Sequence, residues 1–316
     1  MSKRIKIGIS ACLMGQKVRY DGGSFQPKLI HSVLPDYMDF VPFCPEVEIG
    51  MSVPRETVRL VTTETGIKLK APKSGTDYTN QMNAYSIEKT NALSKLEISG
   101  YILKKGSPTC GMERVRVYNS RGIPEKSGNG LFASQLKKAF PNIPIEEDGR
   151  LNDIHLREHW IERVFAYDRL RTFLSLKPAV GKLMEFHTQS KMQLMAHHPE
   201  KYRLLGRKIA LLQKDDLHQF YASYLTSFMQ IMSVKPTIAK HTDVIYHLVG
   251  FFKKKITASD KKEILNLIEQ FRNQIVPIVV PLTLLKHFLQ KYPVKWMQEQ
   301  TYLNPYPTDL SLRSHI

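Results

Sequence analysis

The chain has 316 residues, long enough for two domains that each bury a hydrophobic core. Its 42% apolar and 24% charged residues are ordinary for a globular protein, and no stretch reaches the apolar length that a membrane span needs. We therefore expect no membrane association. The first residues, Met-Ser-Lys-Arg, run directly into a predicted strand without a secretory signal, which predicts a cytoplasmic location.

The formal net charge of +17 is the strongest compositional feature. Residues 1–150 carry 22 Lys and Arg against 15 Asp and Glu, and residues 151–316 carry 24 against 14, so both halves are basic. An excess of this size favours polyanionic partners, RNA or DNA first. The alternative is a basic protein that binds no nucleic acid.

The first half alternates strand-like and helix-like segments. Predicted strands are 3–11, 40–43, a hairpin of 57–61 with 66–70, 98–104, and a short edge strand at 144–145 before a turn at 146–149. Predicted helices are 27–34, a segment capped by Asp77 that ends near Leu96, and 130–140. This alternation predicts an α/β domain over residues 1–155, Rossmann-like, with a mostly parallel sheet and helices on both faces.

The second half has helical periodicity with little alternation. Predicted helices are 156–176, 180–196, 201–212, 215–232, 238–252, 259–274 and 281–291. Prolines separate several of them, namely Pro178, Pro199, Pro236 and Pro277. We expect an all-α domain over residues 156–316.

Each of the three cysteines follows a predicted strand. Cys12 follows the alternation of Ile5, Ile7 and Ile9, Cys44 follows 40–43, and Cys110 follows 98–104. Small molecules and cofactors bind to open α/β sheets beyond the carboxyl ends of the strands. The three thiols are therefore candidate ligands of one bound group. An odd number of cysteines in a cytosolic protein argues against a disulfide framework.

Three thiolates could bind zinc with one open position, or three irons of a 4Fe–4S cluster with the fourth iron open. Zinc sites usually contain CxxC pairs, and the chain has none. The Gly/Ser/Pro loops beside the cysteines offer free backbone N–H groups to cluster sulfurs, which favours iron–sulfur. Three ordinary buried thiols are the remaining alternative.

Polar residues next to the cysteines supply candidate acids and bases. Glu46 lies two residues after Cys44, Ser107 lies three before Cys110, and Asp21 lies in the loop after Cys12. Carboxylates and a hydroxyl beside an open metal are what hydrolytic removal of a soft atom requires. Asp21 before Gly22 could instead be a turn residue, and the nearby Arg55 could pair with a carboxylate.

Basic clusters mark candidate phosphate contacts in the second half. One comprises Arg203, Arg207 and Lys208, and the other is the triplet Lys253, Lys254 and Lys255, which follows an apolar predicted helix. A solvated helix face is the simpler interpretation of each cluster.

Four motifs of the first half resemble the thiouracil desulfidase family, TudS. They are Ser10–Gly15 (SACLMG), Val18–Gly22 (VRYDG), Pro42–Glu46 (PFCPE) and Gly106–Gly111 (GSPTCG), where Thr109 replaces a serine of many relatives. The segment from Phe186-His187-Thr188 to Leu204-Leu205-Gly206-Arg207 resembles the YbgA-type helical domain often fused behind that domain, as in the RudS-like enzymes.

The resemblance implies a 4Fe–4S cluster held by Cys12, Cys44 and Cys110, with one iron left without a protein ligand for substrate sulfur. It implies acid/base or positioning roles for Glu46, Ser107 and Asp21, and sulfur removal from 4-thiouridine in tRNA or from related nucleotides. Water would replace sulfur at the ring carbon and hydrosulfide would leave, without net redox change. The alternatives are a desulfidase of free thiouracil or a mononucleotide, and a non-enzymatic RNA-binding protein with a structural metal site. The oligomeric state is left open.

Overall fold

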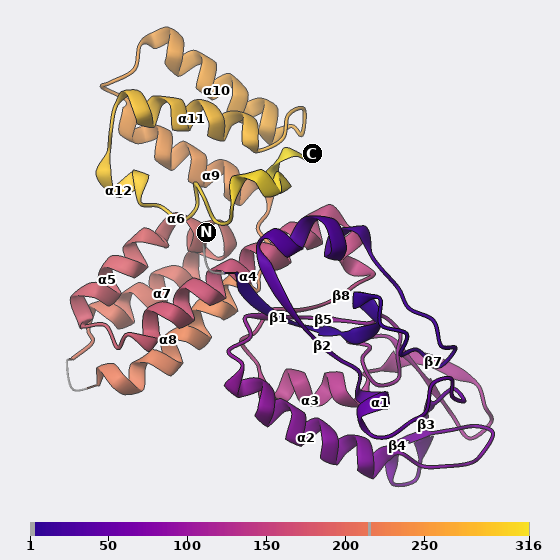
Figure 1. The fold of residues 1–316 in the computed structure, drawn as a ribbon. Helices are drawn as coiled ribbons and strands as arrows, with labels where there is room; N and C mark the ends of the chain where they lie inside the picture. Colours follow the sequence, from indigo (N-terminus) through magenta and orange to yellow (C-terminus); the bar gives the residue numbers. More distant parts are fainter. Residues whose placement is uncertain (1–3, 214–215, 316) are drawn as a thin grey trace. The chain divides into compact units, whose positions relative to one another are not determined.

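The computed structural model describes residues 4–213 and 216–315 and divides into two compact units, Met1–Trp160 and Ile161–Ile316 (Figure 1). The first unit is α/β and the second is helical, as the sequence predicts. Lys3 and Asp215, where two of the predicted elements begin, lie outside the described residues.

A four-stranded parallel sheet forms the centre of the first unit. Its strand order is β2 (Met38–Phe43), β1 (Ile5–Ser10), β5 (Gly100–Leu103) and β8 (Ile145–Glu147). All three pairings are parallel, so the carboxyl ends of the strands lie at one edge. In Figure 1, α2 (Thr79–Lys95) and α3 (Leu131–Ala139) lie side by side on one face, and the short helical turns between β1 and β2 lie on the other.

The pairing of β1 with β5 depends on a glycine. Gly8 lies opposite Tyr101, and a Cβ at Gly8 would lie 2.3 Å from the Tyr101 ring. The ring is fully buried there, between the sheet and the Phe132 ring 6.0 Å away. A side chain at Gly8 would therefore displace the ring that seals this face of the sheet.

A second sheet was not expected from the sequence. It has the order β4 (Gly66–Lys70), β3 (Arg59–Thr63), β6 (Val115–Tyr118) and β7 (Pro124–Gly128). The β3–β4 hairpin confirms the predicted pair of strands, and β6 joins it in parallel. Four of the five β7 residues are exposed, so the strand lacks the apolar alternation by which a sequence reveals a strand.

The predicted turn at 146–149 is wrong in its first half. Glu146 and Glu147 belong to β8, and both are buried together with Asp148. Each carboxylate has partners: Glu146 accepts from Arg150 Nε at 2.7 Å, Glu147 from the Met112 N–H at 2.7 Å, and Asp148 from Lys104 Nζ. Consecutive acidic residues resemble a solvated turn in sequence, but here they hold neighbouring loops.

The second unit consists of helices. Helix α4 (Ile154–Ser175) leads into it, followed by α5 (Val180–Gln189), α6 (Lys191–His197), α7 (Pro199–Ala210), α8 (Leu217–Met232), α9 (Ile238–Val249), α10 (Ala258–Arg272), α11 (Val279–Lys291) and the short α12 (Lys295–Gln298). The predicted single helix 180–196 is two helices that meet at Ser190, where no proline or glycine marks the break.

Buried aliphatic and aromatic side chains of α9, α10 and α11 form a hydrophobic core in this unit, in which Leu248, Ile268 and Leu285 are fully buried. Helix α10 begins with a capping box in which Thr257 and Asp260 bond each other's backbone N–H groups. In the part of the chain that the structure describes, none of the helices combines the length and apolar character needed to cross a bilayer.

Candidate active site

The three cysteines line one cavity. Cys12 follows β1 in a 3₁₀ turn, Cys44 follows β2, and Cys110 closes the loop after β5, so the parallel sheet brings all three to the same edge. The cavity has a volume of about 250 Å³, and Glu46, Ser107 and Thr109 also line it. Cys110 is buried, and Cys12 and Cys44 are partly exposed. The predicted convergence of the thiols therefore has a geometric basis.

The start of α3 supports the Cys110 loop. The Ala133 N–H bonds the Thr109 carbonyl at 3.1 Å, and the Gly130 N–H bonds the Gly111 carbonyl at 2.8 Å. A Cβ at Gly130 would lie 2.4 Å from the Thr109 carbonyl oxygen, so the close contact requires glycine. The start of α3 thereby fixes the position of Cys110.

Burial dominates the electrostatics of the thiols. It raises the pKa of Cys12 to about 11, against the opposing charge of Lys104, and it also raises the pKa values of Cys44 and Cys110. Buried thiols of this kind stay protonated at neutral pH unless a cationic metal takes the place of the proton. Lys104 lines the cavity and donates from Nζ to Asp148 Oδ2 at 2.5 Å, which holds one cation beside Cys12.

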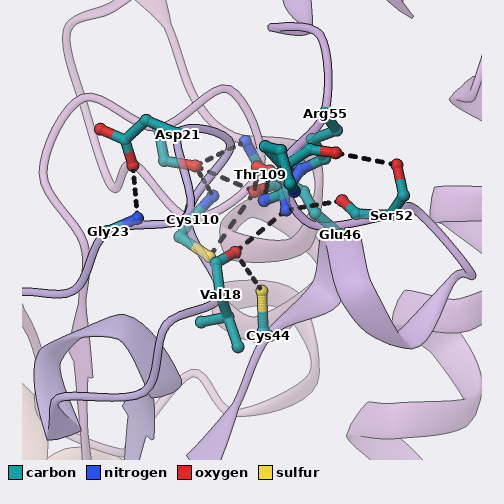
Figure 2. A network of polar contacts seen from close by, with 11 residues as sticks. Val18, Asp21, Gly23, Cys44, Glu46, Ser52, Arg55, Thr109 and Cys110 are labelled. Atoms are coloured by element: carbon teal, nitrogen blue, oxygen red, sulfur yellow. Dashed lines mark hydrogen bonds and ion pairs between the residues drawn. The ribbon is translucent and has the colours of Figure 1, made fainter.

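Glu46 is fixed by an arginine on one side and a hydroxyl on the other (Figure 2). The Arg55 guanidinium donates to Glu46 Oε2 from Nε at 3.0 Å and also from a terminal nitrogen, and Thr109 Oγ1 donates to Glu46 Oε1 at 2.8 Å. The same arginine donates to the Val18 carbonyl at 3.0 Å. The Arg55 and Glu46 side chains are only 6% and 13% exposed, so the ion pair is largely shielded from solvent.

Ser107 and Thr109 form a chain of hydroxyls that ends at this carboxylate. Ser107 Oγ accepts the backbone N–H groups of Thr109 and Cys110 at 3.2 and 3.1 Å, so its lone pairs are engaged. Its hydroxyl lies 2.9 Å from Thr109 Oγ1. Because the Thr109 hydroxyl donates its proton to Glu46, the Ser107 hydroxyl is the donor in the bond between the two hydroxyls.

Asp21 has a different environment. Its carboxylate accepts the Gly23 N–H at 2.9 Å and pairs with Arg19 at 3.2 Å, and it is not among the residues that line the cavity. Figure 2 shows the Asp21 bond to Gly23, which closes a turn in the loop after Cys12. The structure therefore brings Glu46 and Ser107 together with the cysteines and leaves Asp21 beside them.

Arg55 and Thr109 are two residues of the site whose contacts the sequence did not predict. Arg55 was a possible carboxylate partner by proximity in sequence, but its pairing with Glu46 needs the fold. Thr109 read as a mild replacement of serine, although its hydroxyl joins Ser107 to Glu46. Within residues 4–213 and 216–315, no group of three His, Cys, Asp or Glu side chains is gathered tightly enough to hold a metal ion.

The basic clusters of the second unit are exposed. Arg203, Arg207 and Lys208 lie on α7, and the structure records no ion pair for them within its described residues. Lys201 and Lys208 line a groove of about 190 Å³ with Ser227 and Gln230 of α8. Lys253, Lys254 and Lys255 occupy the exposed turn before α10.

Comparisons with known proteins match the two halves separately. The family model of 2-thiouracil desulfurase matches residues 7–148, and that of a protein family of unknown function, DUF1722, matches residues 191–307. The chain is similar to the uncharacterized protein YbbK of Bacillus subtilis, with 33% identity over 153 residues, which are 46% of this chain and 97% of YbbK.

The uncharacterized protein YbgA of Escherichia coli K12 is 28% identical over 152 residues, covering 48% of this chain and 90% of YbgA. Among solved structures, the [4Fe-4S]-dependent thiouracil desulfidase TudS matches with 29% identity and a TM-score of 0.38, over 48% of this chain and 95% of that one.

Proposed function

The chain belongs to the 2-thiouracil desulfurase family, and we propose that it removes sulfur from thiolated uracil by hydrolysis in the cavity at the end of its parallel sheet. The observation that carries the proposal is the convergence of three thiols, a fixed carboxylate and a hydroxyl chain in that cavity. These groups come from three separate segments of the chain, with Cys12 in the first, Cys44 and Glu46 in the second, and Ser107, Thr109 and Cys110 in the third.

The donor set fits an iron–sulfur cluster. Cys12, Cys44 and Cys110 surround an open space, and they are the only thiols in the chain. Three thiolates are the ligands that a 4Fe–4S cluster needs when one iron is left without a protein ligand, as the family resemblance implies. Such a cluster, when bound, would supply a site with high affinity for the thiocarbonyl sulfur of the substrate.

The residues around the thiols supply the proton transfer. Water that attacks the ring carbon loses a proton to the Thr109 hydroxyl, which passes its own proton to Glu46, while the Ser107 hydroxyl donates to Thr109 and orients it. Arg55 holds Glu46 with one oxygen directed at Thr109, which leaves that oxygen as the end of the relay. Water provides the new carbonyl oxygen, and the sulfur leaves as hydrosulfide, so no electron donor is consumed.

The size of the cavity bears on the substrate. Its volume of about 250 Å³ lies below the roughly 300–1,000 Å³ of pockets that hold whole drug-sized ligands. Because the cluster would take part of this volume, the cavity suits at most a single pyrimidine, with any ribose and phosphate outside. A nucleotide within tRNA would have to turn its base out of the stack to enter, as enzymes that modify bases require.

We propose 4-thiouridine in tRNA as the substrate, with the helical unit as the tRNA-binding part. Arg203, Arg207 and Lys208 support this assignment, because their side chains are exposed and no ion pair to them is recorded among the described residues. Lys253–Lys255 form a second candidate contact. Free thiouracil or a mononucleotide would use the same cavity without needing either group of basic residues.

The test uses the full chain purified without oxygen. We expect it to contain iron and acid-labile sulfide, to release hydrosulfide from 4-thiouridine tRNA, and to remove the near-ultraviolet absorbance of the thiolated base. Parallel reactions with 2-thiouracil and a 4-thiouridine mononucleotide rank the substrates by kcat/KM. Release of sulfide from none of the three would contradict the proposed activity, and a preference for the free base would contradict the tRNA assignment alone.

A further inference from the structure

An exposed aromatic side chain lies at the rim of the cavity. Tyr20 lines the cavity and is 45% exposed. Within the described residues, the structure records no hydrogen bond, ring stacking or cation contact for its side chain. Exposed single aromatic residues are common, but this one lies where a planar substrate must pass.

The backbone around Tyr20 is fixed although its side chain is free. The Tyr20 carbonyl accepts the Arg55 N–H at 2.8 Å, which ties it to the residue that orients Glu46. On either side, the Gly22 N–H bonds the Arg19 carbonyl at 3.0 Å and the Gly23 N–H bonds Asp21 at 2.9 Å. Gly22 has φ of 73°, a left-handed conformation that suits glycine in this turn. The ring is therefore presented from a preformed turn.

Phe25, on the same loop, provides a natural comparison. It is 44% exposed, so its exposure matches that of Tyr20, but it is not among the residues that line the cavity. Its ring is also occupied, because Lys104 Nζ lies 4.7 Å from the ring centroid. Of these two aromatic residues with similar exposure, only Tyr20 offers a free ring to a ligand in the cavity.

We propose that Tyr20 is a binding residue whose ring stacks on the pyrimidine as its thiolated edge enters the cavity. The inference rests on the proposed function for the identity of the ligand. Stacking requires a flat, unsaturated ring, so the site selects aromatic pyrimidines over saturated analogues with the same thiocarbonyl group. Ring stacking acts on substrate and product alike, which places its effect on KM and on product binding and leaves kcat unchanged.

The test compares Tyr20→Leu and Tyr20→Phe, with Phe25→Leu as the matched control, at equal iron content. We expect Tyr20→Leu to raise KM for 2-thiouracil and Kd for uracil by roughly 5- to 150-fold, the effect of losing one base–aromatic stack. Tyr20→Phe and Phe25→Leu should stay within about twofold of wild type in these values. Wild type should bind 5,6-dihydrouracil less tightly than uracil, and Tyr20→Leu should abolish that preference.

The measurement of uracil binding needs no turnover. It therefore tests the Tyr20 stack separately from the proposed desulfurase activity. Tyr20-dependent binding of uracil without sulfide release would support the stack and contradict the desulfurase activity. Sulfide release with equal KM in wild type and Tyr20→Leu would support the activity and overturn the stack. Equal losses in Tyr20→Leu and Phe25→Leu would also overturn it, because the effect would then belong to the loop. Absence of uracil binding in wild type would overturn it as well.

Discussion

Cationic side chains near the cavity differ from those on α7. Arg55 binds Glu46, Lys104 binds Asp148 and Arg19 pairs with Asp21, so three of the four cations that line the cavity hold a carboxylate. On α7, Arg203, Arg207 and Lys208 are exposed and have no recorded ion pair among the described residues. Positive charge at the cavity mostly holds carboxylates, whereas positive charge on α7 lies exposed on the surface. The net charge of +17 therefore includes cations in two different environments, which composition alone does not separate.

The largest effect should come from the thiols. We expect replacement of Cys12, Cys44 or Cys110 by Ala to remove the cluster and all desulfuration, because the chain has no spare thiol to replace a ligand. Iron content, visible absorbance and sulfide release measure the loss. Thr57→Ser, which changes another residue lining the cavity, is the control and should keep its iron. A cysteine variant with full iron and full activity would remove that residue from the ligand set.

The hydroxyl relay should give the next largest effect. Thr109→Val preserves shape and removes the hydroxyl between Ser107 and Glu46, so we expect kcat to fall by on the order of 10²–10⁴ with the cluster retained. Glu46→Gln and Ser107→Ala should lose rate in the same range with unchanged iron. Thr109→Ser keeps the hydroxyl and should stay near wild type.

The relay makes a distinctive prediction about combinations. Because Thr109 and Glu46 act in series, Thr109→Val with Glu46→Gln should be little worse than either alone. Rate losses that multiply would show that the residues act independently. Normal turnover by Thr109→Val would place proton transfer on another route.

The smallest effect should come from the surface of α7. Replacing Arg203, Arg207 and Lys208 together by Gln should weaken tRNA binding and reduce the slope of log affinity against log salt, by roughly 0.7–0.9 for each lost phosphate contact. Turnover of a 4-thiouridine mononucleotide should not change. Lys182→Gln is the control, since that exposed lysine is already paired with Glu185 at 2.8 Å.

The same experiment replaces Lys253, Lys254 and Lys255 together by Gln. If this neutralisation flattens the salt dependence and the α7 variant does not, the phosphate contact belongs to the turn before α10. Equal losses on tRNA and mononucleotide in either variant would show that the substitutions disturb folding, and the tRNA-binding assignment would lose its support.

Sequence patterns predicted the positions of the cysteines because strand periodicity is a local property. Ile5, Ile7 and Ile9 alternate, and a parallel sheet then places Cys12 near the other strand ends without further information. The second sheet was missed because β7 is exposed and polar. The acidic segment from Glu146 to Asp148 has the composition of a turn, and the sequence does not show that Arg150, Met112 and Lys104 lie against it.

Within the site, sequence identified the residue types and the structure supplies their pairing. Glu46 and Ser107 were candidates because each lies near a cysteine, but the Thr109 hydroxyl between them and the Arg55 guanidinium behind Glu46 depend on tertiary contacts. Asp21 satisfied the same proximity criterion, and its bonds to Gly23 and Arg19 show the limit of that criterion. Nearness in sequence to a ligand does not determine where a side chain points.

One measurement tests the hydrolytic mechanism most directly. The protein, purified without oxygen, is incubated with thiolated uracil in water labelled with heavy oxygen. The uracil product is analysed by mass spectrometry, and the sulfide released is measured in the same reaction. The account predicts one labelled oxygen in the product for each hydrosulfide, with Thr109→Val slowing both equally. Uracil formed without the label, or labelled uracil formed without hydrosulfide, would contradict it.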